Sequence, residues 1–190
     1  MTRSGVSSGD LKQKQRGVEM SKTLETEFKL KRLSALAIPA ALERAERYRL
    51  LNEPTQAESI CLDILEVDPK NQSALILLLL SLTDQFGDSH FPIGRALALL
   101  PRLNNEYHQT YYQGVIYERQ ARAQLHRTAP GGGSTAYHLL REAMRRYEAA
   151  EDIRPADNDE ALLRWNTCAR TIMSGNLQPS PMDDAIIMLE

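Results

Sequence analysis

The amino-acid sequence predicts an all-α fold, and two observations support that class. Leucine occurs 27 times and alanine 20 times in 190 residues, whereas valine occurs four times, a bias toward helix formers and away from the β-branched residues that strands favour. All nine prolines fall where a helix would begin or end, which is where proline does not interrupt helical hydrogen bonds. The chain is therefore expected to contain helices and turns only.

Reading between these prolines gives eight helices in order. Ser21 or Thr23 is placed to cap the first one, Pro69 closes the third, and Asn71 is placed to cap the fourth. The predicted helices are 22–36, 39–51, 54–67, 72–86, 92–100, 105–127, 134–153 and 158–173.

The two ends of the chain differ from the middle in composition. Residues 1–21 lack the apolar stretch of a signal peptide and are expected to be a disordered leader, followed by a helix over 22–37. The capping pattern after Met20 makes that residue a candidate native start, which mass spectrometry of the natively expressed protein would test. Residues 174–190 are expected to form a flexible acidic tail with an apolar end. This tail either docks on its own domain or serves as a recognition peptide for another protein.

Charge and cysteine content narrow the classes of partner. A formal net charge of −2 gives no overall attraction for nucleic acid or an anionic membrane. The longest apolar run, 74–82, is shorter than the roughly 20 residues of a membrane span. Cys61 and Cys168 are too few for a disulfide scaffold or a multi-cysteine metal site. These features predict a cytoplasmic protein that binds neither nucleic acid nor a membrane.

A pattern of residues at fixed distances along the chain ends at Pro69. Ala57 precedes it by 12 residues, Asn52 by 17, Tyr48 by 21 and Ala45 by 24. This order resembles the tetratricopeptide repeat (TPR), a helix-turn-helix unit, and Asn52 falls at the turn, where a left-handed backbone is expected. The repeat-defining positions of this chain are Ala45, Tyr48, Ala57, Pro69, Gly114, Tyr117, Ala143, Tyr147, Ala150 and Pro155.

The resemblance implies about three repeats with a capping helix, stacked as a right-handed α-solenoid over residues 38–173. The repeats are 38–71, 72–104 and 107–155, the cap is 158–173, and the third repeat contains an inserted loop at about 126–135. Three features depart from the family pattern: Arg44 stands at a usually apolar position, no repeat has the early tryptophan, and about 17 residues are inserted.

In proteins similar to this family, the first helices of successive pairs line a concave groove for a peptide or helix of another protein. The matching residues here are Leu42, Glu46, Arg49, Ile76, Leu80, Thr83, His108, Tyr111, Val115, Glu118, Leu162 and Asn166. Their central strip, Ile76, Leu80, Tyr111 and Val115, predicts an apolar groove with a polar rim. Two other occupants remain open: the helix 22–36 of the same chain, or a second copy in a homodimer.

The expected function is that of an adaptor or scaffold, which requires no enzymatic step and no cofactor. The alternatives are a small secretion-type TPR chaperone and a regulatory or assembly subunit of an enzyme complex. The clamp for acidic chaperone C-termini is not expected, because Leu42 and Glu46 stand where that clamp has Lys and Asn.

The remaining motifs favour structural roles. The loop at 129–135 contains Gly131–Gly133 but no P-loop lysine, so a flexible insertion with Ser134 or Thr135 as helix cap is the preferred interpretation. The four histidines share no metal-ligand spacing, and no metal site is expected. Two groups of arginines are interleaved with acids and predict a solvated, salt-bridged surface: Arg119, Arg122 and Arg127, and Arg141, Arg145, Arg146 and Arg154.

Overall fold

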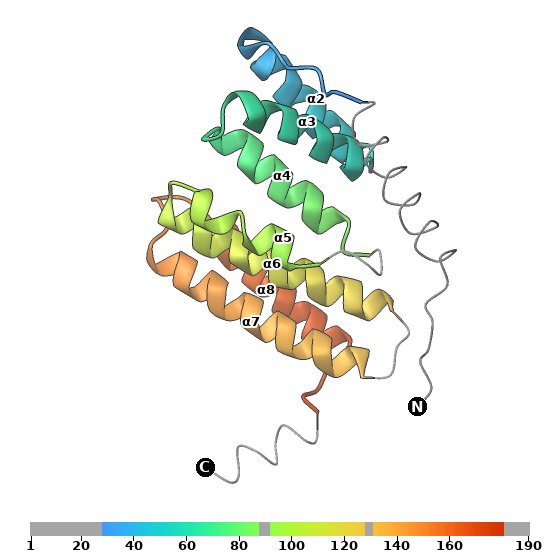
Figure 1. The fold of residues 1–190 in the computed structure, drawn as a ribbon. Helices are drawn as coiled ribbons and strands as arrows, with labels where there is room; N and C mark the ends of the chain where they lie inside the picture. Colours follow the sequence, from blue (N-terminus) through green and yellow to red (C-terminus); the bar gives the residue numbers. More distant parts are fainter. Residues whose placement is uncertain (1–27, 88–91, 128–130, 181–190) are drawn as a thin grey trace, which may run out of the picture. The chain divides into compact units, whose positions relative to one another are not determined.

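The computed structural model describes residues 28–87, 92–127 and 131–180. Within these ranges the protein is helical and contains no strand, which confirms the predicted all-α class (Figure 1). The chain divides into two units, residues 1–32 and 33–190. In the first unit the described residues 28–32 lie outside any helix, and the helices below belong to the second unit.

Six of the predicted helices agree with the structure to within two residues at each end. The α-helices are α2 (Ile38–Leu50), α3 (Pro54–Val67), α4 (Gln72–Asp84), α5 (Gly94–Leu97), α6 (Glu106–His126), α7 (Gly132–Asp152) and α8 (Glu160–Ser174). Two 3₁₀ turns accompany them, η1 (Ala35–Ala37) and η2 (Leu100–Arg102).

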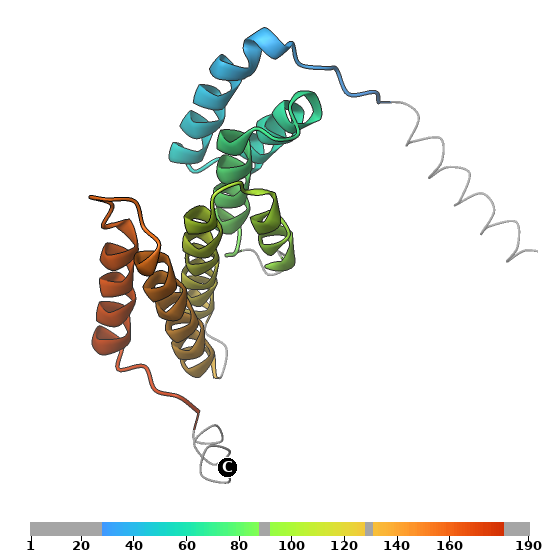
Figure 2. The same ribbon diagram turned by 90° about the vertical axis from the view of Figure 1, so that its left-hand side faces the viewer.

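Helices adjacent in the sequence pack against each other within residues 33–190. α3 lies against both α2 and α4, and α7 lies against both α6 and α8. Contacts of α6 with α4 and α5 join the two groups. α2 also contacts α4, and Arg164 of α8 reaches Glu118 of α6. One side of this unit is formed by four helices in succession (Figure 2). They are the first helices of the three predicted pairs, α2, α4 and α6, and the terminal helix α8. We call these four helices the first-helix layer.

Two buried clusters hold these helices together. The first centres on α3 and α4 and includes Ile64, Leu75 and Leu79, all fully buried. The second lies between α6, α7 and α8 and includes Leu140 and Tyr147. Each helix pair thus buries its apolar face against a neighbouring helix, as a stacked helical array requires.

The turn between α2 and α3 has the predicted left-handed residue. Asn52 has φ of 60°, a conformation that asparagine tolerates better than most other residues. The backbone N–H of Glu53 reaches back to the carbonyl of Tyr48 at 2.9 Å, which satisfies an orphan carbonyl at the end of α2. The predicted cap of α4 is also confirmed, since the Asn71 side chain accepts a hydrogen bond from the N–H of Ala74 at 3.0 Å.

The small residues of the repeat pattern lie at helix crossings. A Cβ added to Gly114 of α6 would lie 2.6 Å from Cε1 of Tyr147 in α7, too close for any side chain. Four alanines of the pattern are fully buried, whereas the prolines follow the ends of α3 and α7 and are exposed. The buried alanines are Ala45, Ala57, Ala143 and Ala150.

Three local predictions differ from the structure. The helix expected over 22–36 is not formed in its described part, because 28–34 are non-helical and Ser34 is extended before the turn η1. The helix expected over 92–100 is reduced to the four residues of α5, which begins at Gly94, followed by the 3₁₀ turn η2, which contains Pro101. α7 begins at Gly132 after a left-handed Gly131, so Ser134 and Thr135 lie inside the helix and do not cap it.

Candidate functional site

All twelve residues of the predicted groove lie on the first-helix layer. α2 carries Leu42, Glu46 and Arg49; α4 carries Ile76, Leu80 and Thr83; α6 carries His108, Tyr111, Val115 and Glu118; α8 carries Leu162 and Asn166.

The apolar strip of this set is used mainly for packing. Tyr111 and Val115 are buried in the second cluster, and Ile76 and Leu80 are half-buried against the first. The exposed part of the layer is consequently more polar than the sequence indicated, and its most connected groups are charged.

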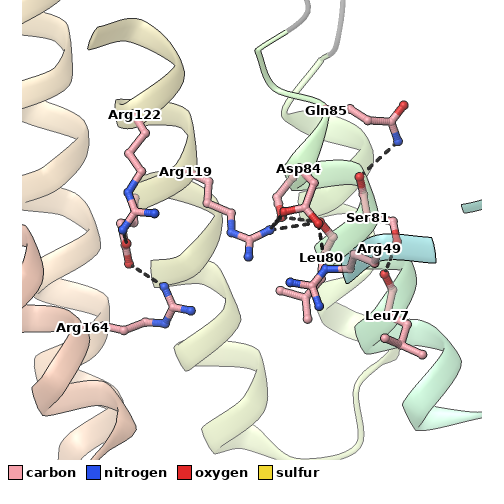
Figure 3. Close-up of polar contacts among 11 residues, drawn as sticks. Arg49, Leu77, Leu80, Ser81, Asp84, Gln85, Arg119, Arg122 and Arg164 are labelled. Atoms are coloured by element: carbon pink, nitrogen blue, oxygen red, sulfur yellow. Dashed lines mark hydrogen bonds and ion pairs between the residues drawn. The ribbon is translucent and has the colours of Figure 1, made fainter. Parts of the chain in front are cut away.

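A carboxylate at the end of α4 joins three helices. Asp84 accepts a hydrogen bond from Arg49 Nε of α2 at 2.7 Å and another from Arg119 of α6. Figure 3 shows the two arginine side chains converging on this carboxylate from opposite sides. Because three elements supply the groups, Asp84 fixes the ends of α2 and α4 against the middle of α6.

Arg119 is held by α4 through further contacts. One of its terminal nitrogens donates to the Leu80 carbonyl at 3.1 Å and to the Thr83 hydroxyl at 2.7 Å. Burial lowers the pKa of the Arg119 guanidinium, and the charge of Asp84 opposes that effect. This arginine, whose side chain is 16% exposed, is mainly a structural link between α4 and α6.

A second carboxylate, Glu118 of α6, is 1% exposed and fully engaged. It accepts hydrogen bonds from the Tyr147 hydroxyl at 2.6 Å, from Arg122 at 2.5 Å and from Arg164 at 3.0 Å. A buried carboxylate is costly unless it is paired in this way. Burial and then the charge of Glu118 raise the pKa of the Tyr147 hydroxyl, which therefore acts as a neutral donor.

Arg164 extends this cluster to the surface of α8. Its Nε donates to the Tyr111 hydroxyl at 2.9 Å, and its guanidinium lies 5.9 Å from the centroid of the same ring. Burial is the largest single effect on the pKa of Arg164 and lowers it. The interactions with Glu118, Tyr147 and Tyr111 together outweigh burial, so the pKa of Arg164 is raised and the side chain stays cationic.

Four arginines on three helices thus share two carboxylates. We call Arg49, Arg119, Arg122 and Arg164 the arginine face. A guanidinium has five N–H donors in a planar fork suited to carboxylates. Within the described part of the chain, Arg49 uses only Nε and Arg122 only one terminal nitrogen in hydrogen bonds. The face can bind anionic groups, and its carboxylates are already occupied by arginines.

Only part of this arrangement could be predicted from the sequence. Arg49, Thr83 and Glu118 were among the expected groove residues, whereas Asp84 and Arg164 were not. Arg119 and Arg122 were expected on a solvated, salt-bridged surface; Arg122 does pair with Glu118 one turn away, but Arg119 reaches across to α4. The i, i+4 spacing of Glu118 and Arg122 signals the first pair, and no sequence spacing signals the second.

Three of the four arginines expected on the other helix and after it form ion pairs as predicted, whereas Arg141 donates a hydrogen bond to Met144 Sδ at 3.9 Å. Arg145 and Arg146 of α7 both pair with Glu142 of the same helix, at 2.6 and 2.7 Å. Hydrogen bonding to Arg145 lowers the pKa of the Glu142 carboxyl. Arg154 pairs with Asp159 beyond the end of α7. These pairs form a solvated surface that is separate from the arginine face.

An apolar hollow lies at the first helix pair. It has a volume of about 260 Å³, and the sequence analysis did not foresee it. Small alanine side chains of η1 and α2 leave this space open beside α3. Its lining is Leu33, Ala37, Ala40, Ala41, Arg44, Ile60 and Asp63.

Both cysteines lie in the interior of the fold. Cys61 and Cys168 are fully buried, and burial raises the pKa of each thiol to about 12. Of the residues described, no three His, Cys, Asp or Glu side chains are grouped so as to hold a metal ion.

Among the described helices, none is both long and apolar enough to span a membrane.

Searches against protein-family models, curated proteins and solved structures found no significant match to this chain.

Proposed function

We propose that the protein is an adaptor that binds a segment of another protein along the first-helix layer. One observation carries the proposal: the arginine face places four cations from α2, α6 and α8 beside only two carboxylates. Interfaces are enriched in arginine and tyrosine at their energetically important positions. Tyr111 lies directly beside Arg164 on this layer.

The proposed helix arrangement is that of a TPR-like right-handed solenoid. The left-handed Asn52, the fully buried alanines and the close crossing of Gly114 and Tyr147 support it. The short α5 makes the second unit incomplete, so the array departs most from the repeat plan between α4 and α6.

In this proposal the partner segment is held by charge and shape. The buried strip, Tyr111 with Val115, supplies a rigid floor, and the arginines supply donors that orient the segment. The proposed segment is an extended or helical stretch with acidic side chains, which would complete the arginines' hydrogen bonding.

A selection from a displayed random peptide library tests this function. Enriched peptides would be measured by fluorescence anisotropy with the native chain and with the double variant Arg49→Gln and Arg122→Gln. Both side chains reach solvent, so the variant can fold while losing two donors of the face. We expect a loss of affinity of at least about tenfold, equivalent to about 1.4 kcal/mol.

Arg145→Gln is the matched control. Its side chain is 60% exposed, against 51% for Arg122, and it also pairs with a glutamate of its own helix. The control should bind peptides as the native chain does. Enriched peptides that bind the double variant and the native chain equally would disprove the proposal.

A further inference from the structure

The charges of the first-helix layer are unevenly distributed along its length. α6 and α8 run in the same direction, because each packs antiparallel to α7, with which each is consecutive in the chain (Figure 1). Glu160 lies at the start of α8, one turn before Arg164, whereas Arg122 lies one turn beyond Glu118 toward the end of α6. On both helices the arginine therefore lies nearer to the end of the helix than the neighbouring acid does.

Arg122 is the most accessible member of the arginine face. Its side chain is 51% exposed, compared with 31% for Arg164 and 20% for Arg49. Figure 3 shows Arg122 and Arg164 approaching one carboxylate from neighbouring helices. Since that carboxylate is shared by two arginines, the pair retains a net positive charge.

The chain that follows α8 carries the complementary charge. From Ser174 to Glu190 there are three acids and no lysine or arginine. Asp183 and Asp184 are adjacent, and the apolar run 185–189 follows them. Residues 181–190 lie outside the described structure, and their composition gives them this charge.

The described part of this segment is held close to the end of α8. The N–H of Gly175 donates to the Thr171 carbonyl at 3.0 Å, and that of Leu177 donates to the Ile172 carbonyl at 3.1 Å. Leu177 packs against the second cluster. Leu177 is therefore a fixed point beside the helix that carries Arg164, six residues before Asp183.

The distances allow residues 181–190 to reach the arginine face. The N–H of Leu177 donates to the carbonyl of Ile172, which lies eight residues, or about 12 Å, from Arg164 along α8. The chain from Leu177 to Asp183 is six residues long and spans up to roughly 20 Å when extended. A tethered segment also has an effective concentration on the order of millimolar, so weak ionic contacts suffice to hold it.

We infer that residues 181–190 bind the arginine face of their own chain, with Asp183 and Asp184 beside Arg122 and Arg164. The inference rests on the proposed function in that it names an internal competitor for the same surface. A partner segment must displace these residues before it binds, which makes the acidic segment a regulator of access.

Paramagnetic relaxation in the full-length chain tests this inference. A nitroxide would be attached through Ala185→Cys, and the two native cysteines are fully buried and should not be labelled in the folded protein. We expect amide signals near Arg122 and Arg164 to broaden. The same labelled chain with Asp183→Asn, Asp184→Asn and Glu190→Gln should lose this broadening, as should the acidic chain in 1 M salt, where the Debye length is about 3 Å.

Two variants locate the contact. Arg122→Gln should reduce the broadening of α6 and α8 signals, and Arg145→Gln should leave it unchanged. The inference is overturned if the signals do not broaden. It is also overturned if they broaden equally in the chain with the native acids and in the chain with the three acids neutralised. Broadening that appears only between separately labelled molecules in a mixed sample also overturns it, because the occupant is then a second copy.

A peptide measurement separates this result from the proposed function. Peptides selected on the native chain should bind the neutralised chain at least about threefold more tightly, because the competing ion pairs are removed. If peptides require the arginine face but broadening is absent, the inference fails and the proposed function stands. If broadening depends on the acids but no peptide binds, the proposed function fails and the internal contact stands.

Discussion

At the scale of single residues, Gly114 and Tyr147 determine how closely α6 and α7 approach. The Tyr147 ring is fully buried, and its hydroxyl is fixed by Glu118 at 2.6 Å. The ring lies where a side chain of residue 114 would be, with three of its atoms within 3.0 Å of the added Cβ. The same tyrosine therefore requires a glycine on one side and donates a hydrogen bond to a buried carboxylate on the other.

Gly114→Ala should destabilise the protein. The new methyl group must displace a buried ring, a type of overpacking that costs about 1–3 kcal/mol and exceeds the gain of up to about 1 kcal/mol in helix propensity. We expect the free energy of unfolding, measured in urea, to fall by roughly 1–2 kcal/mol. Gly94→Ala is the control, because nothing lies within 4 Å of the added Cβ, and its stability should not fall. A Gly114→Ala protein as stable as the native chain would show that this crossing is loose.

At the scale of elements, local signals in the sequence predicted most helices correctly. Pro54 and Asn71 lie at helix starts, and Asn52 lies at the turn between α2 and α3. The helix expected over 92–100 failed because its apolar residues pack against the first cluster without a continuous helix: Ala96 belongs to α5, and Leu100 to η2. Tertiary packing there outweighs helical periodicity.

The candidate site was less predictable than the helices. Repeat spacing placed Thr83 and Glu118 on the correct layer, but the network depends on contacts over long sequence separations. Arg49 meets Asp84 across 35 residues, and Arg164 meets Glu118 across 46. Such contacts depend on how far α2, α4, α6 and α8 are shifted along one another, which the pattern of a single helix does not contain.

The turn between α2 and α3 gives a prediction at this scale. Asn52→Ala should cost about 1 kcal/mol, because alanine is strained at φ of 60°. Asn52→Gly should be neutral or slightly stabilising, since glycine adopts this conformation freely. Both would be measured by thermal and urea unfolding. Asn104→Ala, at an exposed position without positive φ, should change stability by less than about 0.5 kcal/mol. Equal stability of the alanine and glycine variants at position 52 would contradict this account.

At the scale of the whole second unit, residues 33–190, Asp84 adds an ionic link between the parts built around the two clusters. α2 and α4 belong to the first cluster, and α6 contributes most of its buried residues to the second. In a stacked helical array, cooperativity depends on the interfaces between neighbouring units. Asp84 lies at such an interface and forms ion pairs with both Arg49 of α2 and Arg119 of α6.

Glu142 provides a natural comparison, because it is also shared by two arginines but within α7 alone. Asp84→Asn should lower the free energy of unfolding by about 1–2 kcal/mol, since Arg119 loses its counter-ion while largely buried. Glu142→Gln should cost less than about 1 kcal/mol, as expected for an exposed pair.

Hydrogen exchange distinguishes a local loss from a loss of coupling. With Asp84→Asn, amides of α2 and α4 should exchange faster than in the native chain, while those of α7 and α8 stay protected. The two halves would then open independently, because the ionic link between the first cluster and α6 is weakened while the second cluster keeps its own core. Uniformly faster exchange in all helices would show instead that the two cores unfold as one unit and that Asp84 contributes stability without directing where the array opens.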